Sequence, residues 1–133
     1  MKVLFLEDDH NRIAKARREF VGSDLTVAET AQSAIAALDA NRFDLVSLDH
    51  DLGGTVMAES DGNSGYAVAR HIAAMEAPPV FVIIHSFNPV GAQRMEDCLI
   101  ECEALRARLL FDTPKYWQFV EVVKESRKHD RTK

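Results

Sequence analysis

Cysteine and long apolar runs are scarce in this chain. Cysteine occurs only at Cys98 and Cys102, which excludes a small secreted fold stapled by disulfides. The two lie four residues apart with no second Cys or His pair at metal-ligand spacing, so we expect reduced thiols in a cytoplasmic protein. No apolar run approaches the roughly 20 residues that cross a bilayer. The opening residues 1–4 lack the features of a signal peptide, so no membrane partner is expected.

The balance of charge limits the classes of partner. Lys and Arg number 16 against 21 Asp and Glu, a formal net charge of −5. This argues against duplex DNA or an anionic membrane as the main partner. The exception is the segment 124–133, with five Lys or Arg against two acids, which we interpret as a solvated, fraying tail. A tail that contacts phosphate is the less favoured interpretation.

Strand and helix patterns alternate along the whole chain. At 133 residues and 47% hydrophobic content, the sequence predicts one globular domain, residues 1–133. Five alternating units of this kind predict an α/β fold, a doubly wound parallel sheet with helices on both faces. A loop of about a dozen residues is expected at 52–64. Strands are expected at 3–6, 25–28, 43–48, 80–84 and 108–111, and helices at 10–21, 31–40, 65–76, 88–105 and from 114.

Polar residues follow the predicted strands at their carboxyl ends, the edge where open parallel sheets bind ligands. These clusters are Glu7-Asp8-Asp9, Asp49-His50-Asp51, His85-Ser86 and Asp112-Thr113. Carboxylates gathered at one edge repel one another unless a cation neutralises them, and Mg²⁺ is the usual ion for a site built from oxygen ligands. The competing interpretation is that the acids cap the following helices, as acids before a helix often do. Two separate clusters favour the metal site.

Four segments, in their order along the chain, resemble segments of receiver (response-regulator) domains. Val3 to Asp9 resembles their first strand and acidic pair, and Asp44 to Asp49 their third strand with its phosphoacceptor aspartate. Asp61-Gly62 with Gly65 resembles the segment that opens their third helix, and Ser86 matches their phosphate-contacting Ser or Thr. The resemblance implies a flavodoxin-like, three-layer sheet of strand order 2-1-3-4-5. It also implies Mg²⁺ (or Mn²⁺) held by Glu7, Asp8 and Asp49, with Asp49 as the nucleophile.

The sequence departs from the receiver pattern at three places. Receivers carry Lys before the proline that follows their fifth strand, but Thr113 stands here before Pro114, and Lys115 lies just beyond. His50 and His85 occupy positions that are usually apolar in receivers. These features resemble a divergent receiver-like family proposed to process cyclic phosphates. Two histidines that titrate near neutral pH can supply the acid and the base for opening a cyclic phosphodiester, with the metal stabilising charge.

Other residues near these motifs receive weaker assignments. His10 could approach the acidic edge, and Asp51 could orient a histidine. Asn88 is expected to cap a helix rather than to contact phosphate, and His71 and His129 to have no special role. A lone histidine at a strand end is also often structural, and strict alternation puts His85 and Ser86 on opposite faces of their strand.

Three functions remain open from the sequence. The favoured one is a metal-dependent phosphoesterase that acts on a cyclic phosphate of a small molecule or an RNA end, with Asp49, His50, His85 and Ser86 as catalytic residues. The second is a stand-alone receiver that is phosphorylated on Asp49 in a phosphorelay. The third is a degenerate receiver that only binds a protein partner, through aromatic residues near Tyr116, Trp117 and Phe119.

Overall fold

The computed structural model describes residues 1–52 and 62–131, and these form five strands alternating with five helices. All strands pair in parallel, in the order β2-β1-β3-β4-β5, which confirms the predicted flavodoxin-like sheet. Part of the predicted 52–64 loop, including Asp61, lies outside the described residues. The elements are β1 (Lys2–Leu6), α1 (His10–Glu19), β2 (Asp24–Ala28), α2 (Ala31–Ala40), β3 (Leu45–Leu48), α3 (Gly65–Ala74), β4 (Phe81–Ile84), α4 (Pro89–Cys98), β5 (Leu105–Arg108) and α5 (Pro114–Arg131).

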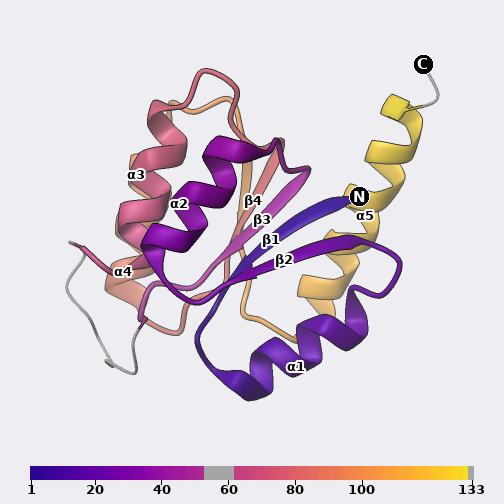
Figure 1. Ribbon diagram of the computed structural model, residues 1–133, viewed down its shortest axis with the longest axis horizontal. Coiled ribbons are helices and arrows are strands. Elements are labelled where there is room, and N and C mark those ends of the chain that lie inside the picture. The colour runs from indigo at the N-terminus through magenta and orange to yellow at the C-terminus, as the bar shows by residue number, and fades with distance from the viewer. Residues whose placement is uncertain (53–61, 132–133) are drawn as a thin grey trace.

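The sheet separates two hydrophobic cores. Helices α1 and α5 cover one face, and α2, α3 and α4 cover the other (Figure 1). Because successive side chains of a strand point to opposite faces, Phe5 of β1 packs toward α1 and α5, whereas Leu4 and Leu6 pack toward the other three helices. The central strands are buried on both faces, which explains their continuous apolar sequence.

Helix caps fix where each connection turns back over the sheet. The Asp9 side chain accepts a hydrogen bond from the Arg12 N–H and starts α1. Thr30 and Ser33 form a reciprocal capping box on α2. Asn88 accepts from the Gly91 N–H, with Pro89 at the first position of α4, as the sequence predicted. The caps at Asp9 and Asn88 place the start of both helices at the carboxyl edge of the sheet.

The fifth strand was predicted three residues too late in the sequence, at 108–111. The observed strand is Leu105–Arg108, and α4 ends at Cys98 rather than near residue 105. The prediction followed hydrophobicity, but β5 is an edge strand that pairs only with β4, and its Leu105 is 60% exposed. The more apolar residues that follow enter the turn instead, where Phe111 packs against Phe5. Asp112 and Thr113 therefore lie beyond the strand end.

The predicted fraying tail was wrong for residues 124–131, which continue helix α5. Arg127 lies on the side of the helix that faces the domain, and its Nε donates to Asp44 Oδ1 at 2.8 Å. The same carboxylate accepts from the Lys2 N–H through its other oxygen at 2.7 Å. A contact across 83 residues thus anchors the basic segment. No helix of the described residues is long and apolar enough to span a membrane.

We expect Arg127→Ala to lower the free energy of unfolding by about 1–2 kcal/mol, because it removes a partly buried, hydrogen-bonded ion pair. Lys128→Ala is the matched control: its ion pair with Glu125 is exposed, and its loss should cost less than about 0.5 kcal/mol. Urea unfolding followed by circular dichroism measures both. Equal stability of the two variants would mean that α5 is not anchored through Arg127.

Candidate functional site

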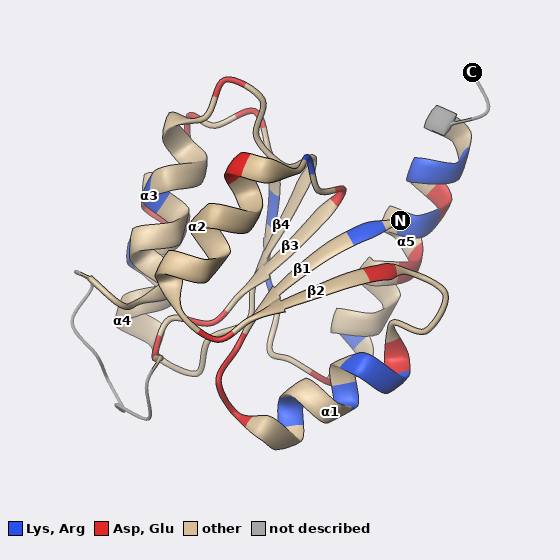
Figure 2. Ribbon diagram, in the orientation of Figure 1, with Lys and Arg blue, Asp and Glu red and all other residues tan. Residues whose placement is uncertain are grey.

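Glu7, Asp49 and His85 form a row across the three central strands. Each follows the last residue of its strand, and the paired register of Leu6, Leu48 and Ile84 brings the three side by side. The Asp49 and His85 N–H groups continue the ladder by donating to Leu6 and Leu48. One ligand atom from each residue lies within 4.8 Å of the others, and all three side chains are buried. Acidic residues mark the segment where β1 leads into α1 (Figure 2).

The two buried carboxylates of this row have too few positive and hydrogen-bonding partners for both to be ionised at once. Burial and the neighbouring Glu7 charge raise the pKa of Asp49 to about 8. Burial also disfavours ionised Glu7, but the hydrogen bond and charge of His85 and the charge of Arg12 lower the pKa of Glu7 below its usual value. The proton of the pair therefore resides on Asp49. The two carboxylates are suitable ligands for a divalent cation, which would replace that proton.

His85 belongs to a buried chain of hydrogen bonds. Its Nε2 lies 3.2 Å from Glu7 Oε1, and its Nδ1 lies 2.7 Å from Ser47 Oγ, which accepts from the Tyr116 hydroxyl at 2.8 Å. Because Glu7 is ionised and can only accept, Nε2 carries the proton, and Nδ1 accepts from Ser47. Burial lowers the pKa of His85, so the ring is neutral in this arrangement. The ring stacks on Phe5 with centroids 5.0 Å apart.

Arg12 lies beside Glu7, and its side chain is partly exposed to solvent. Its Nε is 2.9 Å from Glu7 Oε1, an ion pair by distance in which the N–H is not aligned for a hydrogen bond. Its guanidinium lies over the Phe87 ring, with the carbon 5.4 Å from the ring centroid. Arg12 comes from α1 and Phe87 from the loop between β4 and α4, so this contact links two connections at the carboxyl edge.

His50 is not part of the row. It follows Asp49 in the chain, but its side chain is buried against α4, on the other face of the sheet from His85. Its Nδ1 lies 2.9 Å from Asp51 Oδ1 and 3.3 Å from Asn88 Nδ2, and Asn88 also donates to Asp51 at 3.1 Å. A Cβ at Gly91 would collide with the His50 ring. This cluster fixes the end of β3 against the start of α4, and it bears out the expectation that Asp51 orients a histidine.

The remaining predicted residues lie around the row without joining it. Asp8 is half-buried, its N–H donates to Glu7 Oε2 at 3.1 Å, and it does not belong to the group of close ligand atoms; its role as a ligand stays a prediction. Ser86 is buried, and its Oγ accepts from the Asn88 N–H at 3.0 Å. His10 is exposed and pairs with Glu29. Thr113 donates to the Leu110 carbonyl oxygen and accepts from the Tyr116 N–H, so it starts α5.

Sequence reasoning missed Ser47, Tyr116 and Arg12. Ser47 had a signal: it is the one polar residue of β3, two positions before Asp49 and hence on the same face. Tyr116 was considered only with its neighbours, as part of an interface under the third function or as packing for the last helix, and it is fully buried. Gly65, by contrast, was named from the sequence. The structure explains why glycine is needed there, because a Cβ would collide with the Asp49 carbonyl oxygen. Gly65 therefore allows α3 to start close to the end of β3.

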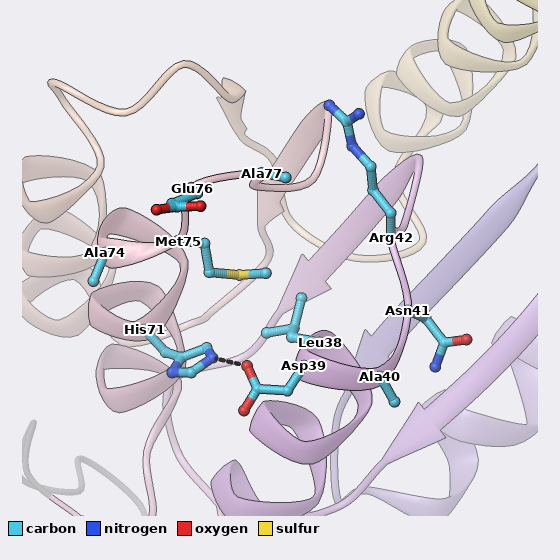
Figure 3. Close-up of a pocket in the computed structure, with 10 residues that line it drawn as sticks. All are labelled: Leu38, Asp39, Ala40, Asn41, Arg42, His71, Ala74, Met75, Glu76 and Ala77. Atoms are coloured by element: carbon cyan, nitrogen blue, oxygen red, sulfur yellow. Dashed lines mark hydrogen bonds and ion pairs between the residues drawn. The ribbon is translucent and has the colours of Figure 1, made fainter.

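A separate hollow of about 570 Å³ lies at the opposite end of the sheet, where α2 and α3 end (Figure 3). Leu38 and Met75 lie within it, and His71 Nε2 contacts Asp39 Oδ1 at 2.7 Å across it. None of its lining residues belongs to the row, so the hollow plays no part in the chemistry considered below.

Comparison with solved structures identifies receiver domains of low sequence identity. The receiver domain of a putative Luxo repressor protein from Vibrio parahaemolyticus is 21% identical, with a TM-score of 0.66, covering 99% of this chain and 96% of that one. The receiver domain of a sensor histidine kinase from Pseudomonas aeruginosa, with magnesium coordinated in its active-site cleft, is 19% identical, with a TM-score of 0.67 and coverage of 93% and 94%. The response regulator TrrA from Thermotoga maritima, in complex with Mg²⁺ and BeF, is 18% identical, with a TM-score of 0.66 and coverage of 92% and 97%. These likenesses show the fold.

No curated protein matches the sequence. A family model does: the cyclic-phosphate processing receiver domain matches residues 2–101, which include β1 to β4 and every residue of the row. The chain therefore belongs to the family of cyclic-phosphate processing receiver domains.

Proposed function

We propose that this chain is a metal-dependent phosphoesterase that opens cyclic phosphodiesters, such as those of a nucleotide or an RNA end. The observation that carries the proposal is the buried row of Glu7, Asp49 and His85 in a member of this family. Two carboxylates at this distance are costly unless a cation lies between them. The magnesium ions held by related receiver domains support the same assignment.

Glu7 and Asp49 would hold the cation, with Asp8 as a further oxygen ligand. Carboxylate oxygens of this kind suit both Mg²⁺ and Mn²⁺. When bound, such an ion lowers the pKa of a coordinated water and stabilises negative charge on the phosphate. Asp49 must lose its proton to bind the ion, because a carboxylate coordinates in its ionised form.

The residues around the row supply positioning and proton transfer. His85 holds Glu7 through Nε2 and connects it to Ser47 and Tyr116, so a proton can shift along hydroxyl groups that both donate and accept. The Ser86 hydroxyl, which accepts from Asn88, keeps its own O–H to donate to a phosphate oxygen. His50 contributes by fixing the loop that follows Asp49, rather than as the acid or base.

Phosphorylation of Asp49 is the second candidate. Asp49 and Ser86 follow neighbouring strands, as the phosphoacceptor and the Ser or Thr do in the receiver pattern. Thr113 in place of Lys argues against it, since its hydroxyl is engaged with Leu110 and carries no charge. Incubation with acetyl phosphate and Mg²⁺ followed by mass spectrometry distinguishes the two: gain of a phosphoryl group on wild type but not on Asp49→Asn would favour this candidate.

We expect turnover of 2′,3′-cyclic nucleotides with Mn²⁺ or Mg²⁺, and a loss of about 100-fold or more in kcat for Asp49→Asn, because that variant loses a carboxylate ligand. His85→Asn should fall by about 10-fold or more, since it removes the link between Glu7 and Ser47. His71→Ala is the matched control, because its partner Asp39 lies at the other end of the sheet. Separation of the products by anion exchange gives the rates, and no turnover of a panel of cyclic phosphates with either metal would refute the proposal.

A second expectation concerns stability in a chelator, without divalent ions. Asp49 has a raised pKa, so the folded state binds a proton that the unfolded chain has already lost at neutral pH. That contribution to stability is lost as pH rises through about 8. As pH rises from about 6.5 to 8.5, the urea midpoint of wild type should therefore decrease relative to that of Asp49→Asn. This window lies above the ordinary pKa of histidine. Parallel pH profiles of the two proteins would contradict a protonated Asp49 in the row.

A further inference from the structure

Arg12 is held beside the row by contacts that do not involve its terminal amino nitrogens. Its backbone is fixed by the Asp9 cap, its Nε faces Glu7 Oε1, and its plane lies over Phe87. Among the described residues, neither of its terminal amino nitrogens has a hydrogen-bond partner, and about a third of the side chain is exposed. The side chain is therefore held through its Nε and its guanidinium carbon, and its two terminal nitrogens keep their N–H groups for a ligand.

No other cation of the described residues contacts the row. Lys15 pairs with Glu19 at 3.3 Å, and Lys115 is exposed at the start of α5. Thr113, where the receiver resemblance predicts a lysine, is engaged in starting α5. A phosphate that approached Glu7 and Asp49 would meet negative charge, and Arg12 is the group placed to offset it.

We propose that Arg12 binds the phosphate of the ligand at this edge, in place of the missing lysine, with Phe87 as the platform that fixes the guanidinium plane. The assignment rests on the proposed function, because it supplies the recognition of phosphate that the metal-bound row requires. A planar guanidinium offers two parallel N–H donors, which match two non-bridging oxygens of a phosphate. The preferred ligand class is a phosphate or phosphodiester anion with two free oxygens, and a lysine would not reproduce this fork.

The competing explanation is that Arg12 only neutralises Glu7. The two roles differ in what a lysine can rescue. Arg12→Lys keeps a positive charge near Glu7 but loses the paired donors, and Phe87→Ala keeps the guanidinium but removes its platform. A neutralising role predicts that Arg12→Lys resembles wild type in every measurement. A phosphate-binding role predicts that Arg12→Lys binds phosphate more weakly than wild type while its affinity for the metal is kept.

The test measures two affinities separately. Binding of Mn²⁺ is followed by electron paramagnetic resonance of the free ion, and binding of inorganic phosphate to the Mg²⁺-saturated protein by ³¹P NMR. We expect Arg12→Gln and Arg12→Lys to weaken phosphate binding by about tenfold or more, the loss of one to two charge-assisted hydrogen bonds. Phe87→Ala should weaken it by a smaller factor, and Mn²⁺ affinity should change by less than about threefold. Arg17→Gln, exposed on the same helix, is the matched control and should match wild type.

Three results would overturn the assignment: no phosphate binding by the wild-type protein, unchanged phosphate affinity in Arg12→Gln, or an equal loss of metal and phosphate affinity. If Arg12→Gln does not fold, as judged by its urea transition, Arg12→Lys and Phe87→Ala decide by the same criteria. These outcomes are independent of turnover. A wild-type enzyme that hydrolyses cyclic phosphates while Arg12→Gln binds phosphate normally would refute the role of Arg12 and leave the proposed function standing.

Discussion

The buried carboxylate of Glu7 is the constraint on which the carboxyl edge of the sheet depends. A fully buried anion needs close partners, and it finds His85 and Arg12 at Oε1 and the N–H groups of Asp8 and Asp9 at Oε2. These contacts tie the end of β1 to β4 and to α1. They leave Asp49, one strand away, to carry the proton of the pair. Because Glu7 stays ionised, its charge raises the pKa of Asp49, and a divalent cation would replace the proton that Asp49 carries.

The fold followed from the sequence wherever both faces of a strand are buried. The apolar runs of β1, β3 and β4 and the caps at Thr30 and Asn88 marked these elements within a few residues. The prediction failed at the edge, where β5 is mostly exposed and hydrophobicity no longer marks the strand. It failed again at α5, because the pairing of Arg127 with Asp44 joins segments 83 residues apart and has no local signature.

The candidate site was predicted in part for the same reason. Acids that close buried strands identify Glu7 and Asp49, and the likeness to receivers identifies the edge. The sequence could not show the register that aligns Glu7, Asp49 and His85 on one rung, nor that His50 turns to the other face. Nor could it show that the Arg12 side chain reaches Glu7, because that contact depends on how α1 packs beside the end of β1.

The two histidines that distinguish this chain from the receiver pattern make different contacts, because their side chains lie on opposite faces of the sheet. His85 points into the aromatic core of α1 and α5, where a neutral ring between Glu7 and Ser47 satisfies every buried polar atom along its path. His50 points toward α4, and its ring occupies the space that Gly91 leaves open. With the start of α5 secured by Thr113 and Asp112, which accepts from the Trp117 indole, positive charge reaches the row from the α1 side instead. A phosphate bound there would be recognised by a side chain of α1 rather than by one at the start of α5.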